Sequence, residues 1–186
     1  MNSYKTLLLP GWMSRVKNYG IGEGLDIWKK FGDPTANLDA QYLIGHSLGC
    51  HYALLNWQAN RNARLILVNP PLLKRSSIVW LYRWLRYKMI EGLGVSFKDI
   101  LAADIPAGIM NCHKLFQGDF EKIIREIPKK DLVIVKGQND NYFCDHDVAD
   151  FARAEQIRLI EVAGSGHNWS EDIRQTIINF IGDGKY

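Results

Sequence analysis

Short apolar runs alternate along the chain with longer segments whose apolar residues recur every three or four positions. The short runs are nearly continuous, which is typical of strands buried on both faces of a parallel sheet. Each run ends in a small or turn-forming cluster, such as Pro10-Gly11. This alternation predicts βαβ units. The predicted strands are Lys5–Leu9, Gln41–Ile44, Leu65–Asn69, Leu132–Lys136 and Arg158–Val162.

Three segments carry apolar residues on one helical face. One follows Gly49, one begins after Asp119 and stops at Pro128, and one lies near Tyr186. Their apolar stripes are Cys50, Ala53, Leu54 and Trp57; Phe120, Ile123, Ile124 and Ile127; and Ile173, Ile177, Phe180 and Ile181. With the strands, they predict a three-layer α/β fold with a minimal, mostly parallel sheet.

The range 72–117 interrupts the alternation, because it has several helical patterns and no strand-like run. A connection of this length between two strands predicts an insertion that lies over the strand ends. We therefore expect one domain, residues 1–186, with a helical cap at about 72–117.

Composition narrows the class of protein. A chain of 186 residues that is 47% hydrophobic supports one well-buried core, and a net charge of +3 with dispersed basic residues does not predict nucleic-acid binding. The three cysteines are far apart and suggest no disulfide framework. The apolar run near Met1 is too short for a signal peptide, and no run reaches the roughly 18 residues of a membrane span. We expect a cytoplasmic protein.

Candidate chemistry begins at Gly45-His46-Ser47-Leu48-Gly49, which fits the G-x-S-x-G pattern of a nucleophile elbow. A strand leads into this motif and an amphipathic helix leaves it, as the elbow requires. Gly45 and Gly49 supply the small neighbours that a sharp turn needs. The alternative is that Ser47 is an ordinary helix N-cap, a position that suits serine.

A serine hydroxyl needs a base to take its proton and an acid to orient that base. In a parallel sheet both should follow later strands, because the carboxyl ends of the strands meet at one edge. Asp140 follows the strand Leu132–Lys136, and His167 follows the last strand in the glycine-flanked loop AGSGHNWSED. Ser47, Asp140 and His167 thus have the chain order of this type of triad.

Asp145 and Asp147 compete with Asp140, but DHDVADFARAE resembles a helix start, so we expect N-cap and first-turn roles for them. The cluster Cys144–Asp147 is not expected to bind metal, since adjacent residues rarely all face one ion. The remaining histidines, His46, His51, His113 and His146, are interpreted as structural. Gly20–Gly24 is interpreted as a flexible loop, not as a phosphate-binding loop.

The backbone N–H groups of Leu48 and Trp12 are the candidate oxyanion-hole donors. Leu48 follows the nucleophile at a helix N-terminus, and Trp12 follows the first strand. Trp12 is also expected to form a wall of the pocket, the alternative being a core aromatic residue.

The stretch Lys74–Lys88 is the most basic in the chain. Its helical period puts Trp80, Trp84 and Tyr87 on one face, so these three are candidate pocket or lid residues. Three interpretations stay open: a lid with outward basic residues for an acidic carrier protein, a membrane-surface helix, or a plain cap helix.

These motifs together make the chain resemble the α/β-hydrolase superfamily over nearly its whole length. In detail it resembles compact serine hydrolases of the retinoblastoma-binding-protein-like group, with Pro10-Gly11, the Gly45–Gly49 elbow, Asp140 and Gly166-His167. It is also similar to short biotin-pathway esterases, which act on acyl chains bound to a carrier protein. The short first connection before Gln41 and Pro10 in place of a common histidine depart from the larger relatives.

The sequence therefore predicts a serine hydrolase that cleaves esters or thioesters through an acyl-enzyme and uses no cofactor or metal. Its expected substrate is a small molecule or a carrier-linked acyl chain, with an acyl carrier protein as a candidate partner. A non-catalytic binding protein and an acyltransferase with the same triad are the alternatives.

Overall fold

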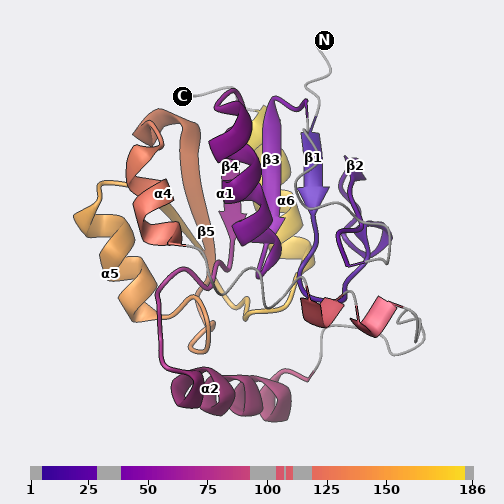
Figure 1. The fold of residues 1–186 in the computed structure, drawn as a ribbon, viewed down its shortest axis with the longest axis vertical. Coiled ribbons are helices and arrows are strands. Elements are labelled where there is room, and N and C mark those ends of the chain that lie inside the picture. The colour runs from indigo at the N-terminus through magenta and orange to yellow at the C-terminus, as the bar shows by residue number, and fades with distance from the viewer. Residues whose placement is uncertain (1–5, 29–38, 93–103, 107, 111–118, 183–186) are drawn as a thin grey trace.

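The computed structural model describes residues 6–28, 39–92, 104–106, 108–110 and 119–182 of the chain. Within these ranges the core is a six-stranded sheet in the order β2-β1-β3-β4-β5-β6 (Figure 1). Every neighbouring pair in it is parallel. The strands are β1 (Thr6–Leu9), β2 (Glu23–Gly24), β3 (Tyr42–His46), β4 (Arg64–Val68), β5 (Leu132–Gly137) and β6 (Arg158–Val162).

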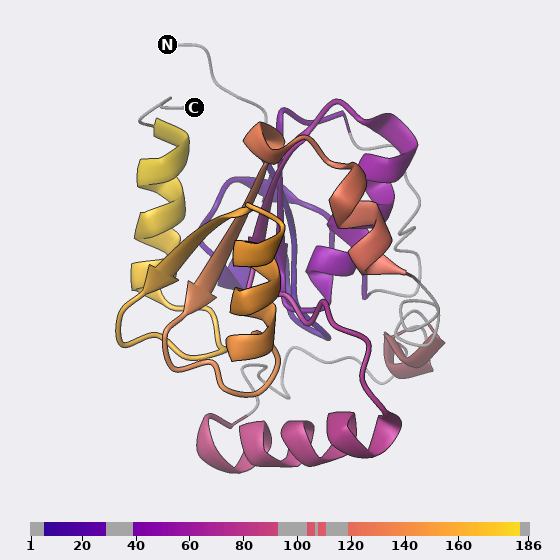
Figure 2. The same cartoon turned by 90° about the vertical axis from the view of Figure 1, so that its left-hand side faces the viewer.

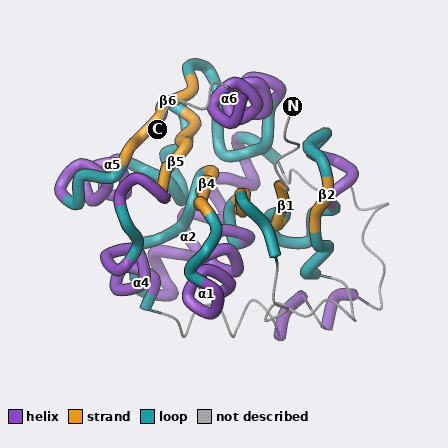
Figure 3. The backbone as a smooth tube through the Cα atoms, turned by 90° about the horizontal axis from the view of Figure 1, so that it is seen from above, coloured by secondary structure: helices purple, strands orange, loops and turns teal. Residues whose placement is uncertain are grey.

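Two apolar clusters cover the two faces of this sheet, because successive strand residues point to opposite sides. In β3, Leu43 belongs to one cluster, whereas Tyr42 and Ile44 belong to the other. The first cluster takes in α1 (Gly49–Asn60), α4 (Phe120–Glu126) and α5 (His146–Ala154), and the second takes in α6 (Glu171–Gly182). Figure 3 shows α6 on the face opposite α1 and α4. The predicted three-layer α/β architecture is confirmed.

The helix stripes expected from the sequence face these clusters. Cys50, Ala53, Leu54 and Trp57 of α1 are buried, as are Ile173 and Ile177 of α6. Asp119 caps α4, where its carboxylate accepts a hydrogen bond from the Lys122 N–H at 3.2 Å. Among the described residues, η1 (Val16–Asn18) and η4 (Lys129–Asp131) are short 3₁₀ turns.

The helix α2 (Ser77–Ile90) lies across the end of the molecule to which the strands point (Figure 2). Its place is therefore over the carboxyl ends of the strands, where a parallel sheet gathers functional loops. Of the predicted cap at 72–117, residues 93–103, 107 and 111–117 lie outside the described residues, and Cys112 and His113 are among them.

The interpretation of Gly20–Gly24 as a flexible loop was wrong in part. Gly20–Gly24 is not loop throughout, since Glu23–Gly24 forms the edge strand β2 on β1. Two residues are too few to show an apolar alternation. The signal is instead the lack of a side chain, because a Cβ on Gly24 would lie 2.4 Å from the Leu8 carbonyl oxygen.

Candidate active site

Ser47 lies on the sharp turn between β3 and α1 and has a left-handed backbone, with φ of 52°. Such a conformation is strained for a residue with a side chain. The two flanking glycines allow it. A Cβ on Gly45 would lie 2.5 Å from the Cys50 Cα, and one on Gly49 would lie 2.1 Å from the Leu9 carbonyl oxygen. The motif is therefore required by close backbone packing as well as by the turn.

The helix N-cap alternative for Ser47 is wrong, because Leu48 occupies the N-cap of α1. The Ser47 hydroxyl is instead 2.9 Å from Nε2 of His167. Ser47 thus stands outside the helix with its oxygen directed to the loop after β6.

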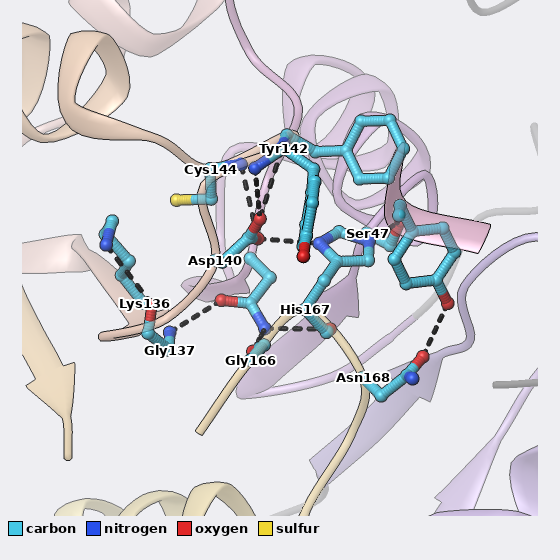
Figure 4. Close-up of polar contacts among 12 residues, drawn as sticks. Ser47, Lys136, Gly137, Asp140, Tyr142, Cys144, Gly166, His167 and Asn168 are labelled. Carbon is cyan, nitrogen blue, oxygen red and sulfur yellow. Dashed lines mark hydrogen bonds and ion pairs between the residues drawn. The ribbon is translucent and has the colours of Figure 1, made fainter. Parts of the chain in front are cut away.

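His167 lies between Ser47 and Asp140, as Figure 4 shows. Its Nδ1 is 2.6 Å from Oδ2 of Asp140, which is fully buried. A carboxylate only accepts hydrogen bonds, so Nδ1 carries the proton. The free lone pair of Nε2 then faces the Ser47 hydroxyl, which is the tautomer that a base toward serine requires.

Asp140 is held as an anion. Burial alone raises its pKa, but the charge and hydrogen bond of His167 and backbone N–H groups outweigh burial, and the pKa is lowered overall. The N–H groups of Tyr142 and Phe143 donate to Oδ1 at 3.1 Å, and that of Cys144 donates to Oδ2 at 3.2 Å. These three donors also fix the carboxylate plane.

Hydrogen bonds also hold the backbone of His167. Its carbonyl oxygen accepts from Nδ2 of Asn69 at 2.9 Å, and its N–H donates to the Glu91 carboxylate at 2.8 Å. Asn69 is fully buried, and its Oδ1 also accepts from the Gly137 N–H at 2.7 Å. It therefore joins the end of β5 to the histidine loop.

A second chain of hydrogen bonds runs behind the site through Tyr19 and His46. The Gly11 N–H donates to the Tyr19 hydroxyl at 2.8 Å, and that hydroxyl lies 2.8 Å from Nδ1 of His46. Nε2 of His46 is 3.0 Å from the His167 carbonyl oxygen, so Nε2 must be the protonated nitrogen. The Tyr19 hydroxyl consequently donates to Nδ1. This chain joins the loop after β1, the residue before Ser47 and the histidine loop.

Burial keeps both members of this pair neutral. It lowers the pKa of His46 to about 3, with His167 adding repulsion, and it raises the pKa of the Tyr19 phenol. Near neutral pH the two groups therefore keep the hydrogen-bond directions described above.

A cavity of about 570 Å³ opens above Ser47 and His167. It brings together the other residues that the sequence singled out. Trp12 and Leu48 line it from the body, and Trp80, Trp84 and Tyr87 line it from α2. Tyr87 and Phe143 pack their rings on the His167 ring at centroid distances of 5.2 and 4.6 Å. The walls are mainly aromatic and suit an apolar ligand.

Ion pairs and hydrogen bonds hold α2 against the rest of the molecule. Before its first turn, Arg75 donates to Asp145 at 2.7 Å, and Arg83 also pairs with Asp145. At its C-terminus, the Glu91 carboxylate accepts from the N–H groups of His167 and Asn168. In the lid interpretation the basic residues of this stretch face outward. Arg75 and Arg83 do not, because their guanidinium groups pair with the buried carboxylate of Asp145.

The competing acids and histidines have other roles. Asp145 is the N-cap residue of α5 and Asp147 lies in its first turn, as expected, although the Asp145 side chain makes no cap hydrogen bond. His51 is buried in α1, and His146 begins α5. No group of three potential metal ligands occurs among the described residues.

Sequence reasoning missed Asn69, Glu91 and Tyr19 as parts of this site. Asn69 had a signal, because it begins a turn cluster directly after a strand, where parallel sheets place functional groups. Glu91 and Tyr19 lie in segments without a strand end or motif, and only the folded arrangement brings them to the histidine loop.

The comparisons agree on the fold. No family model and no curated protein matches the sequence. Among solved structures, an α/β hydrolase from a Medee basin deep-sea metagenome library superposes with a TM-score of 0.68 at 13% identity, over 100% of this chain and 92% of that one. A structure from work on carboxylesterases of the thaumarchaeon Nitrososphaera gargenis gives 0.62 at 14% identity, over 98% and 91%.

A third similar structure is the thioesterase domain from the curacin biosynthetic pathway, with a TM-score of 0.56 at 14% identity over 96% of this chain and 91% of that one. At such identities the likeness concerns the fold. The chain has the α/β-hydrolase fold, which confirms the resemblance at the level of the fold.

Proposed function

We propose that this protein is a serine hydrolase that cleaves carboxylic esters through Ser47, His167 and Asp140. One observation carries the proposal: an unbroken hydrogen-bonded line from a buried carboxylate through an imidazole to a serine on a strained turn. That line ends in a cavity of about 570 Å³, large enough for a small ester.

The reaction proceeds in two steps. As Ser47 Oγ attacks the ester carbonyl carbon, Nε2 of His167 takes the hydroxyl proton, and the tetrahedral intermediate then collapses with expulsion of the alcohol, which receives that proton. Water attacks the acyl-enzyme in the same way and releases the acid. The Asp140 carboxylate stabilises the imidazolium in each step.

The negative charge on the carbonyl oxygen needs hydrogen-bond donors. We assign this role to the backbone N–H groups of Leu48 and Trp12, because both residues line the cavity beside Ser47. Leu48 also stands at the N-terminus of α1, where the helix dipole favours an anion.

A carrier-linked thioester is a second candidate substrate. The same steps cleave a thioester, a thioesterase domain is among the similar structures, and Lys74, Arg86 and Lys88 stay exposed for an acidic carrier. Transfer of the acyl group to an acceptor other than water uses the same residues. The cytoplasmic location expected from the sequence stays a prediction.

A fluorophosphonate probe tests the proposal, since it labels only an activated serine. We expect the native protein to be labelled, Ser47→Ala to be blank, and His167→Ala to react at least about 1,000-fold more slowly. Ser77→Ala, which removes an exposed hydroxyl on α2, is the matched control and should label like the native protein. A well-folded native protein that takes no label would favour the binding-protein alternative.

A further inference from the structure

The outer surface of α2 carries a continuous apolar stripe. Ile78, Leu81, Tyr82, Leu85 and Met89 recur at the spacing of one helical face, and their exposed fractions are 81%, 58%, 60%, 45% and 84%. The opposite face holds Trp80, Trp84 and Tyr87 against the cavity. A helix that is apolar on both faces is normally buried on both, so this outer stripe marks an interaction surface.

Basic side chains flank the outer stripe on both sides. From Lys74 to Ile90 there are five lysines and arginines and no acidic residue. Arg75 and Arg83 are paired with Asp145, whereas Lys74, Arg86 and Lys88 are exposed.

The helical rotation of about 100° per residue sets Arg86 and Lys88 on opposite flanks of the outer stripe. The ring contacts agree, because Arg86 lies over Tyr82 and Lys88 lies over Trp84, at 5.8 and 5.4 Å. An occupant of the stripe therefore meets positive charge on both edges.

The outer stripe is continuous with the cavity. Leu81 belongs to the stripe and also lines the cavity, together with Trp80 and Trp84. Apolar side chains thus lead from the molecular surface to the space above Ser47. An apolar ester can follow this path without leaving apolar contact.

Three kinds of occupant differ in how they meet these features. A second copy placed by a two-fold axis would bring the cations of one α2 near those of the other, which is repulsive. An acidic carrier protein would satisfy the cations but would also need a groove for five large apolar side chains. An anionic bilayer satisfies both, because acyl chains take the stripe and headgroups take the cations.

We propose that α2 docks on the surface of an anionic membrane, with the outer stripe in the acyl region and Lys74, Arg86 and Lys88 at the headgroups. On the proposed function, the esterase then takes an apolar ester directly from the bilayer. The helix has 14 residues and lies on the membrane. No helix in the described part of the chain is long and apolar enough to span one.

Co-sedimentation with vesicles tests this docking. We use vesicles of phosphatidylcholine alone and of phosphatidylcholine mixed with phosphatidylglycerol. The three exposed cations should make binding to the anionic vesicles on the order of 100-fold tighter than to the neutral ones, and added salt should weaken it. Equal or absent binding to both kinds of vesicle would overturn the proposal.

Two double variants separate the contributions. Leu85→Ser with Met89→Ser should weaken binding to anionic vesicles at least about 10-fold, and Arg86→Gln with Lys88→Gln should remove most of the preference for anionic lipid. Ile178→Ser is the matched control, since Ile178 is an exposed apolar residue of α6. Unchanged binding by the first variant would contradict the proposal.

Other partners give different results. A concentration-dependent dimer that Leu85→Ser with Met89→Ser abolishes, without vesicle binding, would assign the stripe to a second copy. Binding of an acylated carrier protein that both double variants lose, again without vesicle binding, would assign it to a carrier. Vesicle binding by Ser47→Ala should equal that of the native protein. The two proposals therefore fail in different experiments. Failure of the esterase proposal appears only in probe labelling, and failure of the docking proposal appears only in vesicle co-sedimentation.

Discussion

Replacement of Asp140 by asparagine is predicted to remove activity, because it reverses the donor and the acceptor in the hydrogen bond to Nδ1 of His167. In the native site Oδ1 accepts from Tyr142 and Phe143, and Oδ2 accepts from Cys144 and the His167 ring. If the amide oxygen keeps the first pair, the NH₂ group faces one backbone donor and the His167 ring. If the amide turns over, two backbone donors lose their acceptor. Each such loss costs about 1–3 kcal/mol, so the first orientation is favoured.

In that orientation the NH₂ group donates to Nδ1 of His167, so the proton moves to Nε2. The imidazole then has no lone pair toward Ser47 and cannot take its proton. Loss of the correct tautomer costs about 1,000- to 10,000-fold in kcat, equivalent to about 4–5.5 kcal/mol. The unsatisfied Cys144 N–H should also lower the free energy of unfolding by about 1–3 kcal/mol.

The assay is kcat for a soluble p-nitrophenyl ester, together with urea unfolding to show that Asp140→Asn is folded. Asp150→Asn, on the exposed surface of α5, is the matched control and should keep native kcat. A folded Asp140→Asn variant within ten-fold of native kcat would refute the reasoning. So would a large loss in Asp145→Asn without one in Asp140→Asn, which would assign the orienting role to the competing acid.

Four further predictions concern the site and the buried histidines. Tyr19→Phe breaks the hydrogen-bond chain that runs behind the site through Tyr19 and His46, and it should lower kcat about 10-fold with KM unchanged. In the same assay His46→Gln, which keeps a donor and an acceptor, should retain a higher kcat than His46→Leu. Burial lowers the pKa of His46 to about 3 and that of His51 to about 4, so below pH 6.5 the unfolded chain binds more protons than the folded one. The free energy of unfolding, measured by urea unfolding, should therefore fall by about 2 kcal/mol per histidine between pH 7 and pH 5. In His51→Gln this fall should be smaller by the share of one histidine, and an unchanged fall would contradict the assignment. Gly49→Ala puts a Cβ 2.1 Å from the Leu9 carbonyl oxygen of β1, so it should lower the free energy of unfolding by about 3 kcal/mol and abolish probe labelling. Gly182→Ala, with open space around its Cβ, should change neither.

The sheet was predictable because five strands are largely apolar and are followed by turn residues. Parallel topology then places those ends together. This is why Ser47, Asp140 and His167, separated by up to 120 positions, meet as expected from their places after three separate strands. The strand β2 was missed since two residues on a sheet edge carry no pattern.

The supports of the site were harder to predict for a different reason. Glu91 and Tyr19 act through a carboxylate and a hydroxyl that reach a loop distant in sequence, and no local rule specifies such a partner. Arg83 shows the same limit, because helical period places it on a face but does not reveal the buried Asp145 that draws it inward.

The Glu91 contact bears on how caps are exchanged between α/β hydrolases. A cap that only covered the cavity could be replaced by another cap, joined to the same two ends of the chain, to change the range of substrates. Here the backbone of His167 depends on Glu91 of the cap, and Asp145 of the body depends on Arg75 and Arg83. A transplanted cap without these three side chains would leave the buried Asp145 carboxylate unpaired and remove the acceptor of the His167 N–H. A replacement cap must therefore bring equivalents of Arg75, Arg83 and Glu91 if both contacts are to be kept.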